Sequence, residues 1–153
     1  MWLEPLIRPV ARDIPLRLAP IKRDWIESGS PEARCAVLAT SDDRAVTTVL
    51  WTCTAGRFTW RYDFDESLYI LDGGVTISAP GEPDRRLGPG DSMHFSRGAV
   101  ATWDIDSHVR KVAFCRDAPP RPVSLALRLA RGLLRRFGSA RKTLAAAPAL
   151  VER

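Results

Sequence analysis

The chain has 153 residues, 45% of them hydrophobic and 27% charged, which is the balance of a single soluble globular domain. Its net charge is +5, but residues 118–153 hold eight basic residues against Glu152 alone, a charge of +7 that leaves −2 for the first 117 residues. This distribution argues against a body that binds nucleic acid. No apolar run is long enough for a membrane span and the N-terminus does not read as a signal peptide, so we expect a cytoplasmic protein. The three cysteines, Cys35, Cys53 and Cys115, are widely spaced and are interpreted as reduced thiols.

Residues 1–32 are rich in proline and are predicted to form an extended arm, because proline interrupts long helices. The prolines of this segment are Pro5, Pro9, Pro15, Pro20 and Pro31. Residues 21–26 read Ile-Lys-Arg-Asp-Trp-Ile, and we expect the tryptophan and the isoleucines to pack against the domain that follows.

Residues 33–117 alternate apolar and polar side chains with a period of two, which is typical of β-strands. Strands are predicted at residues 45–53, 58–62, 68–71, 75–78, 93–95, 100–105 and 109–115. Glycine, proline and aspartate separate them at short, regular intervals, as turns do. Many short strands at this spacing predict an all-β domain, either a β-sandwich or a jelly-roll barrel.

Residues 118–153 begin with prolines and then change to a helical period, which predicts a basic amphipathic helix. The apolar face holds Val123, Ala126, Ala130, Leu133, Leu134 and Phe137, and the opposite face holds Arg128, Arg131, Arg135 and Lys142. Three interpretations of this segment remain open. It packs on the barrel or on a second subunit, it makes peripheral contact with an anionic membrane surface, or it is a loosely ordered extension.

Residues 56–73 contain the most informative motif of the chain. Phe58, Trp60 and Tyr62 alternate along a predicted strand, Glu66 follows them, and the turn residue Gly73 comes seven positions after the glutamate. This spacing resembles the first cupin motif, in which a strand with two metal-binding histidines precedes the glutamate and the glycine. Trp60 and Tyr62 stand at the two histidine positions.

Further marks follow in order along residues 21–114. They are Asp24-Trp25, Gly29-x-Pro31, Trp51-x-Cys53-x-x-Gly56-x-Phe58-x-Trp60, Asp65-Glu66, Leu71-x-Gly73, Gly90-Asp91, Arg97-Gly98, Thr102-Trp103 and Arg110-Lys111. Together they resemble the small cupin family named after ureidoglycine aminohydrolase, a manganese-dependent enzyme with two barrels. The resemblance implies a cupin jelly-roll β-barrel at residues 33–117, a proline-rich N-terminal arm at residues 1–32 that packs on it, and a C-terminal amphipathic helix at residues 118–153.

The positions that carry metal ligands in cupins do not hold suitable residues here. The second cupin motif contributes a further histidine, whose position corresponds to Ala101. An indole only donates a hydrogen bond and a phenol is an uncommon ligand, so Trp60 and Tyr62 do not replace the histidines. Glu66 alone cannot supply the three or more protein ligands of a typical transition-metal site. We therefore predict no metal and no cofactor.

The aromatic residues allow two interpretations. If alternate residues point inward, Phe58, Trp60, Tyr62 and Trp103 line the barrel and either fill its core or form a pocket. In a pocket they would stack a planar or apolar small molecule, with the Tyr62 hydroxyl and the Trp60 indole N–H as polar groups.

Glu66 is the candidate catalytic residue. It would accept a hydrogen bond from a ligand or act as a general acid/base, and the alternative is that it caps a turn or pairs with Arg61. The segment Arg110-Lys111 is interpreted as a solvated strand end, and the alternative is that it reaches an anion at the rim of the barrel. His94 is expected to face away from the pocket, and His108 is expected to lie in a solvated turn.

The leading hypothesis is a cupin-fold homodimer that binds an unidentified small molecule without a metal. Its candidate ligand-binding residues are Phe58, Trp60, Tyr62, Glu66 and Trp103. One alternative is an enzyme that acts on a small nitrogenous metabolite, as the resemblance implies, with Glu66 as acid/base. The other is a structural or tethering protein that acts through its basic C-terminal helix.

Overall fold

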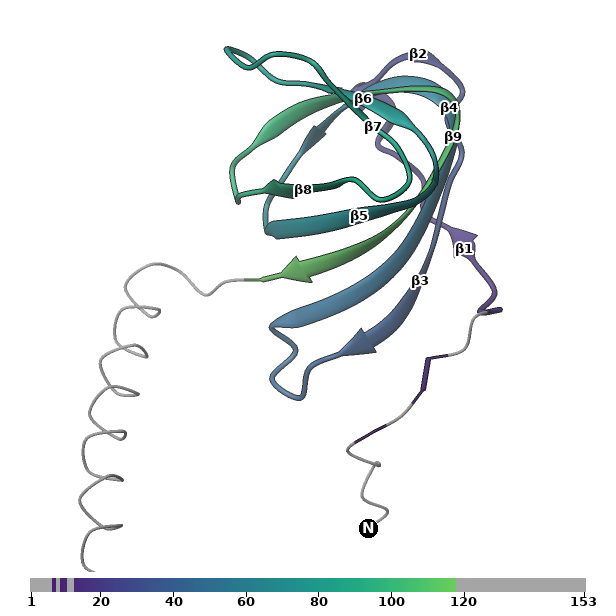
Figure 1. The fold of residues 1–153 in the computed structure, drawn as a ribbon, viewed down its shortest axis with the longest axis vertical. Helices are drawn as coiled ribbons and strands as arrows, with labels where there is room; N and C mark the ends of the chain where they lie inside the picture. The colour runs from purple at the N-terminus through teal and green to yellow at the C-terminus, as the bar shows by residue number, and fades with distance from the viewer. Residues whose placement is uncertain (1–6, 8, 11–12, 118–153) are drawn as a thin grey trace, which may run out of the picture. The chain divides into compact units, whose positions relative to one another are not determined.

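The computed structural model describes residues 7, 9–10 and 13–117, which form an antiparallel β-structure (Figure 1). Nine strands belong to one strongly curved sheet, and a 3-10 turn, η1 (Arg23–Trp25), is the only helical element of the described residues. The strands are β1 (Arg17–Leu18), β2 (Ile26–Gly29), β3 (Ala33–Thr40), β4 (Val46–Arg61), β5 (Asp65–Gly73), β6 (Val75–Ser78), β7 (Arg85–Leu87), β8 (Ser92–Phe95) and β9 (Val100–Arg116). The all-β prediction is confirmed for this part of the chain, and the predicted C-terminal helix lies outside it.

The two longest strands, β4 and β9, are continuous where the sequence predicted a break in each. They pair with each other from end to end, and their register shifts once, between Thr54 and Gly56 of β4. The predicted turn around His108 is therefore wrong, because His108 lies within β9 opposite Thr54. Glycine and short polar residues mark β-bulges as well as turns, so composition alone could not distinguish the two.

The shift in register divides the sheet into two halves that share β4 and β9. On one side of the shift, the strands lie in the order β1-β3-β4-β9-β5-β8. On the other side, β2 pairs with β4, and β6 pairs with both β9 and β7. A bulge increases the local bend and twist of a strand pair. The two halves therefore curve toward each other as a jelly-roll barrel, with their inward faces forming the core (Figure 1).

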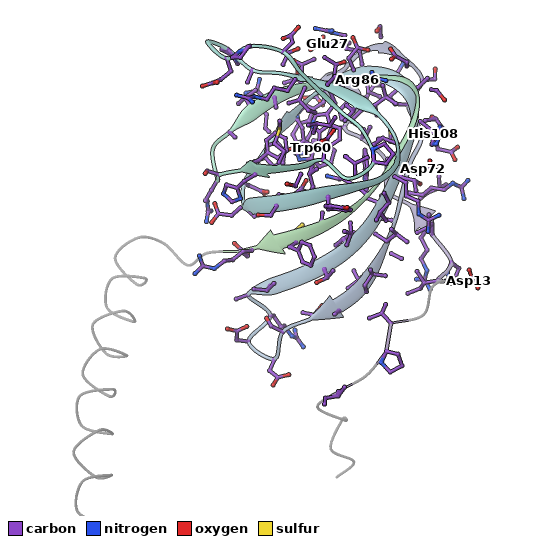
Figure 2. The ribbon with its side chains drawn as sticks, in the orientation of Figure 1. Asp13, Glu27, Trp60, Asp72, Arg86 and His108 are labelled. Atoms are coloured by element: carbon purple, nitrogen blue, oxygen red, sulfur yellow. The ribbon has the colours of Figure 1, made fainter. Side chains whose placement is uncertain are left out.

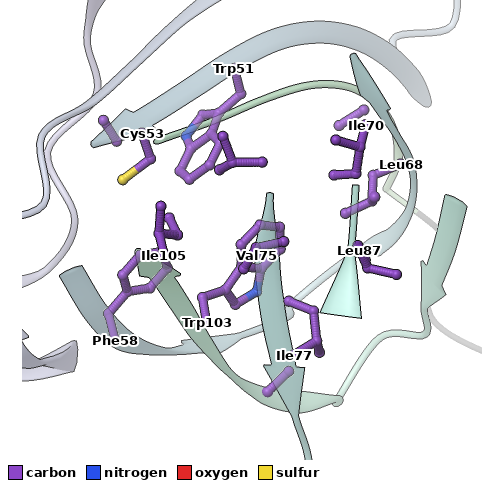
Figure 3. Packing of buried hydrophobic residues seen from close by; sticks show 14 of the residues in the cluster. Trp51, Cys53, Phe58, Leu68, Ile70, Val75, Ile77, Leu87, Trp103 and Ile105 are labelled. Atoms are coloured by element: carbon purple, nitrogen blue, oxygen red, sulfur yellow. The ribbon is translucent and has the colours of Figure 1, made fainter. Parts of the chain in front are cut away.

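The core is built from large side chains of both halves. Figure 3 shows Phe58 and Trp103 among aliphatic residues of β5, β6 and β7. Phe58 and Trp103 are register partners on β4 and β9, and their rings stack with centroids 6.1 Å apart and planes at 10°. Both are almost completely buried, with exposed fractions of 0% and 2%.

The described part of the N-terminal arm adds to the wall of the barrel. β1 extends the sheet at the edge of β3, and β2 pairs with β4. Between these strands Ile21 is buried, and Trp25 packs edge-on against Trp60 with ring centroids 5.3 Å apart. Within the described part of the chain, no helix is long and apolar enough to span a membrane.

Candidate ligand-binding site

A cavity of about 340 Å³ lies inside the barrel, and all five residues predicted to bind a ligand line it. These are Phe58, Trp60, Tyr62, Glu66 and Trp103. The rest of the lining comprises Ala19, Pro20, Cys35, Val49, Trp51, Phe64, Lys111, Ala113 and Cys115. Small-molecule sites usually measure roughly 300–1,000 Å³, so this cavity would hold a molecule of one or two rings.

The alternation of side chains along β4 changes across the bulge. Val49 and Trp51 reach the cavity from odd-numbered positions, whereas Phe58 and Trp60 reach it from even-numbered positions. A shift of one residue moves every following side chain to the other face of a strand. The irregularity near Gly56 therefore brings aromatic residues from two predicted strands to the same cavity.

A buried ion pair is the main polar feature of the cavity. Lys111 Nζ donates a hydrogen bond to Glu66 Oε1, and the two side chains are 7% and 6% exposed. The ammonium also lies 5.0 Å from the ring centroid of Trp51 and 4.6 Å from that of Trp103, which are cation–π distances. The Cys115 thiol lies 3.8 Å from Glu66 Oε2. A carboxylate and an ammonium that would each be costly to bury alone thus neutralise each other.

This pair corrects two predictions. Glu66 pairs with Lys111 rather than with Arg61, which is exposed at the end of β4. Lys111 is buried and is not a solvated strand end. A signal for this was present in the sequence, because Lys111 alternates with Val109 and Ala113, which are also buried.

Tyr62 and Trp60 line the cavity in different ways. Tyr62 is 3% exposed; its ring stacks on Phe95 with centroids 4.4 Å apart, and its hydroxyl accepts a hydrogen bond of 3.2 Å from Trp103 Nε1. Burial, together with the nearby charge of Glu66, raises the pKa of the Tyr62 hydroxyl well above its usual value. Trp60 is only half-buried and lies within the curve of the sheet (Figure 2).

The buried thiol of Cys53 and the half-buried thiol of Cys115 are poor nucleophiles at neutral pH. Burial and the neighbouring Glu66 carboxylate raise the pKa of Cys115 to about 11. Burial raises the pKa of Cys53, which belongs to the core and does not line the cavity, to about 12. Since the thiolate is the reactive form of cysteine, the raised pKa values disfavour reaction at these two thiols near neutral pH.

The residues of the cavity do not fit the metal ion of metal-binding cupins. Trp60 and Ala101 are register partners on β4 and β9, and neither they nor Tyr62 offers a suitable ligand atom. Glu66 is already bound by the Lys111 ammonium. Across residues 13–117, no group of three or more histidine, cysteine, aspartate or glutamate side chains is placed to hold a metal.

Neither histidine lines this cavity. His94 is exposed on β8 and hydrogen-bonds Ser67 at 2.9 Å, so the prediction that it faces away is confirmed. His108 is also exposed, and its Nε2 lies 2.9 Å from a carboxylate oxygen of Asp72 (Figure 2).

The barrel and the inward-facing motif define the class of this protein as a cupin fold, which confirms that prediction. Residues 40–113 match the family described as the EutQ-like cupin domain. No curated protein matched the sequence.

Solved structures with the same fold include three that illustrate its range. A protein assigned as ethanolamine utilization protein Q from Salmonella typhimurium LT2 is 21% identical, with a TM-score of 0.52 over 63% of this chain and 76% of its own. A DUF861 family protein of unknown function from Pseudomonas syringae pv. tomato is 19% identical, with a TM-score of 0.63 over 69% of this chain and 46% of its own, so the present chain spans less than half of it. The polyketide cyclase RemF from Streptomyces resistomycificus is 16% identical, with a TM-score of 0.56 over 75% of this chain and 83% of its own. At these identities the likeness establishes the fold alone.

Proposed function

We propose that this cupin-fold protein binds a small planar molecule in the aromatic cavity without a metal ion. The observation that supports the proposal is that an open cavity of about 340 Å³ persists between large rings that are themselves well packed. The apolar walls would contribute hydrophobic burial, and the ring faces would stack a planar ligand. Glu66 and Lys111 would supply the few polar contacts that orient it.

The proposal is tested by calorimetric titration of the full chain with indole, an uncharged planar probe. We expect saturable binding with a Kd of about 1 mM or below, as stacking of a two-ring fragment would give. Ala113 lines the cavity and is 2% exposed, so Ala113→Leu should fill part of the space and weaken binding at least ~10-fold.

The matched control is Val112→Leu on the same strand. Val112 does not line the cavity, so this variant should bind indole as the unmodified chain does. Absence of saturable binding, or unchanged affinity in a folded Ala113→Leu variant, would contradict the proposed function.

A second candidate is an enzyme that acts on a small nitrogenous metabolite, as the resemblance to the ureidoglycine aminohydrolase family suggests. The observation that favours it is that Glu66 and Lys111, two groups able to exchange a proton, adjoin each other in the cavity. If a substrate is found, Glu66→Gln should abolish turnover while binding is retained. The homodimer, the cytoplasmic location and a tethering role for residues 118–153 stay predictions.

A further inference from the structure

The ion pair of the cavity has hydrogen-bonding capacity on both of its members. A carboxylate accepts through two oxygens; Glu66 Oε1 takes the bond from Lys111, whereas Oε2 receives, among the described residues, only the weak thiol donor of Cys115 at 3.8 Å. An ammonium has three N–H groups, and one of those of Lys111 is directed to Glu66. The cavity therefore presents a strong acceptor and a strong donor side by side.

The pair has no net charge, and this decides which ligands it favours. Because Lys111 and Glu66 are in direct contact, an ion that approaches one of them also lies close to the like charge of the other. Attraction and repulsion then largely cancel, while the cost of removing the ion from water remains. Removing an uncharged group from water on entering the cavity costs far less free energy.

We propose that the cavity selects uncharged planar molecules that carry a hydrogen-bond donor next to an acceptor, such as aromatic primary carboxamides and lactams. The amide N–H binds Glu66 Oε2 and the amide carbonyl accepts from Lys111, while the ring lies among the aromatic walls. This inference rests on the proposed function and names the chemical class of its ligand.

Three probes of nearly the same shape test the selection: benzamide, benzoate and benzamidinium, each titrated into the full chain at pH 7 by calorimetry. We expect benzamide to bind at least ~10-fold more tightly than either ion, because it alone satisfies both groups without a like-charge contact. Tighter binding of benzoate or benzamidinium than of benzamide would overturn the inference.

Two variants shift the charge of the cavity in opposite directions. Glu66→Gln leaves Lys111 without its counter-charge, so the affinity for benzoate should rise at least ~10-fold relative to the affinity for benzamidinium. Lys111→Met leaves the carboxylate without its counter-charge, so the affinity for benzamidinium should rise relative to the affinity for benzoate. Should Lys111→Met fail to fold, the order in the unmodified chain and the nearly isosteric Glu66→Gln still decide the matter.

The control and the link to the proposed function are separate measurements. Glu27→Gln removes an exposed carboxylate from the ion pair with Arg57, outside the cavity, and should leave the order of the probes unchanged. If indole binds but benzamide does not exceed both ions, the inference fails and the proposed function stands. If benzamide does not exceed both ions and indole also fails to bind, both the inference and the proposed function fail.

Discussion

At the scale of single residues, Lys111 and Glu66 are the most consequential side chains of the barrel. Each would be costly to bury alone, and each is nevertheless less than a tenth exposed. Their mutual contact, with the ring faces of Trp51 and Trp103 around the ammonium, compensates for the lost water. Such a pair adds little net stability compared with apolar residues of similar size, but loss of one member leaves a buried charge.

A double-mutant cycle measures this dependence. Lys111→Met and Glu66→Leu should each lower the free energy of unfolding by about 3–5 kcal/mol, whereas the double variant should be far more stable than the sum of these losses implies. Urea denaturation provides the four free energies. The exposed pair Glu32–Arg34, with side chains 53% and 46% exposed, is the control and should show coupling of about 0–1 kcal/mol. Additive losses at Lys111 and Glu66 would refute this account.

At the scale of elements, the junction between β5 and β6, which both pair with β9, depends on a glycine for two reasons. Gly73 ends β5 with φ +70°, a conformation that side chains with a Cβ rarely adopt. A Cβ at this position would also lie 2.1 Å from the carbonyl oxygen of His108 on β9. Gly81, in the turn between β6 and β7, has φ +80° but no atom within 4 Å of such a Cβ. Comparing a substitution at Gly73 with the same substitution at Gly81 therefore separates the cost of backbone conformation from the cost of crowding.

We expect Gly81→Ala to destabilise the protein by about 1–2 kcal/mol through its backbone conformation alone. Gly73→Ala should cost about 1–3 kcal/mol more, because the strand β9 has to shift to admit the methyl group. Thermal or urea unfolding of the two variants measures the difference. Equal losses would show that the junction between β5 and β6 accommodates the added methyl group without strain.

At the scale of the whole molecule, the barrel keeps several titratable groups in their protonated form. Tyr62 lies in the loop after β4, Cys53 on β4 and Cys115 on β9, and burial raises the pKa of each. While both the folded and the unfolded chain keep such a proton, it does not lower the free energy of unfolding. Once the pH is high enough for the unfolded chain to lose the proton, the free energy of unfolding falls. The contribution is therefore complete at neutral pH and is lost in alkaline solution.

The free energy of unfolding should be insensitive to these groups below about pH 9, the ordinary thiol pKa, and should fall as the pH rises toward about 11 and 12. Urea midpoints measured between pH 7 and pH 11 under reducing conditions test this. Cys115→Ala should make the decrease shallower, since one of the contributing thiols is gone. Stability that stays constant or increases up to pH 11 would be inconsistent with the burial of these groups.

Local pattern was enough for a large part of the fold and for five of the fourteen residues that line the cavity. The period of two predicted the strands and the inward direction of Phe58 and Trp60, since alternation is a property of a single strand. Tyr62 and Glu66, which follow on the loop after β4 and on β5, were predicted from the spacing of the motif. The breaks predicted in β4 and β9 were wrong, because a bulge and a turn draw on the same residue types and only strand pairing distinguishes them.

The sequence by itself determined the β-rich class, the aromatic motif and the lack of metal ligands at Trp60, Tyr62 and Ala101, because each of these depends on residue type and short-range spacing. Only the tertiary structure decided that Lys111 meets Glu66, 45 positions away along the chain, and that the large rings leave a cavity between them. The partner of a buried charge and the space between packed side chains depend on register and curvature, which arise when distant strands pair.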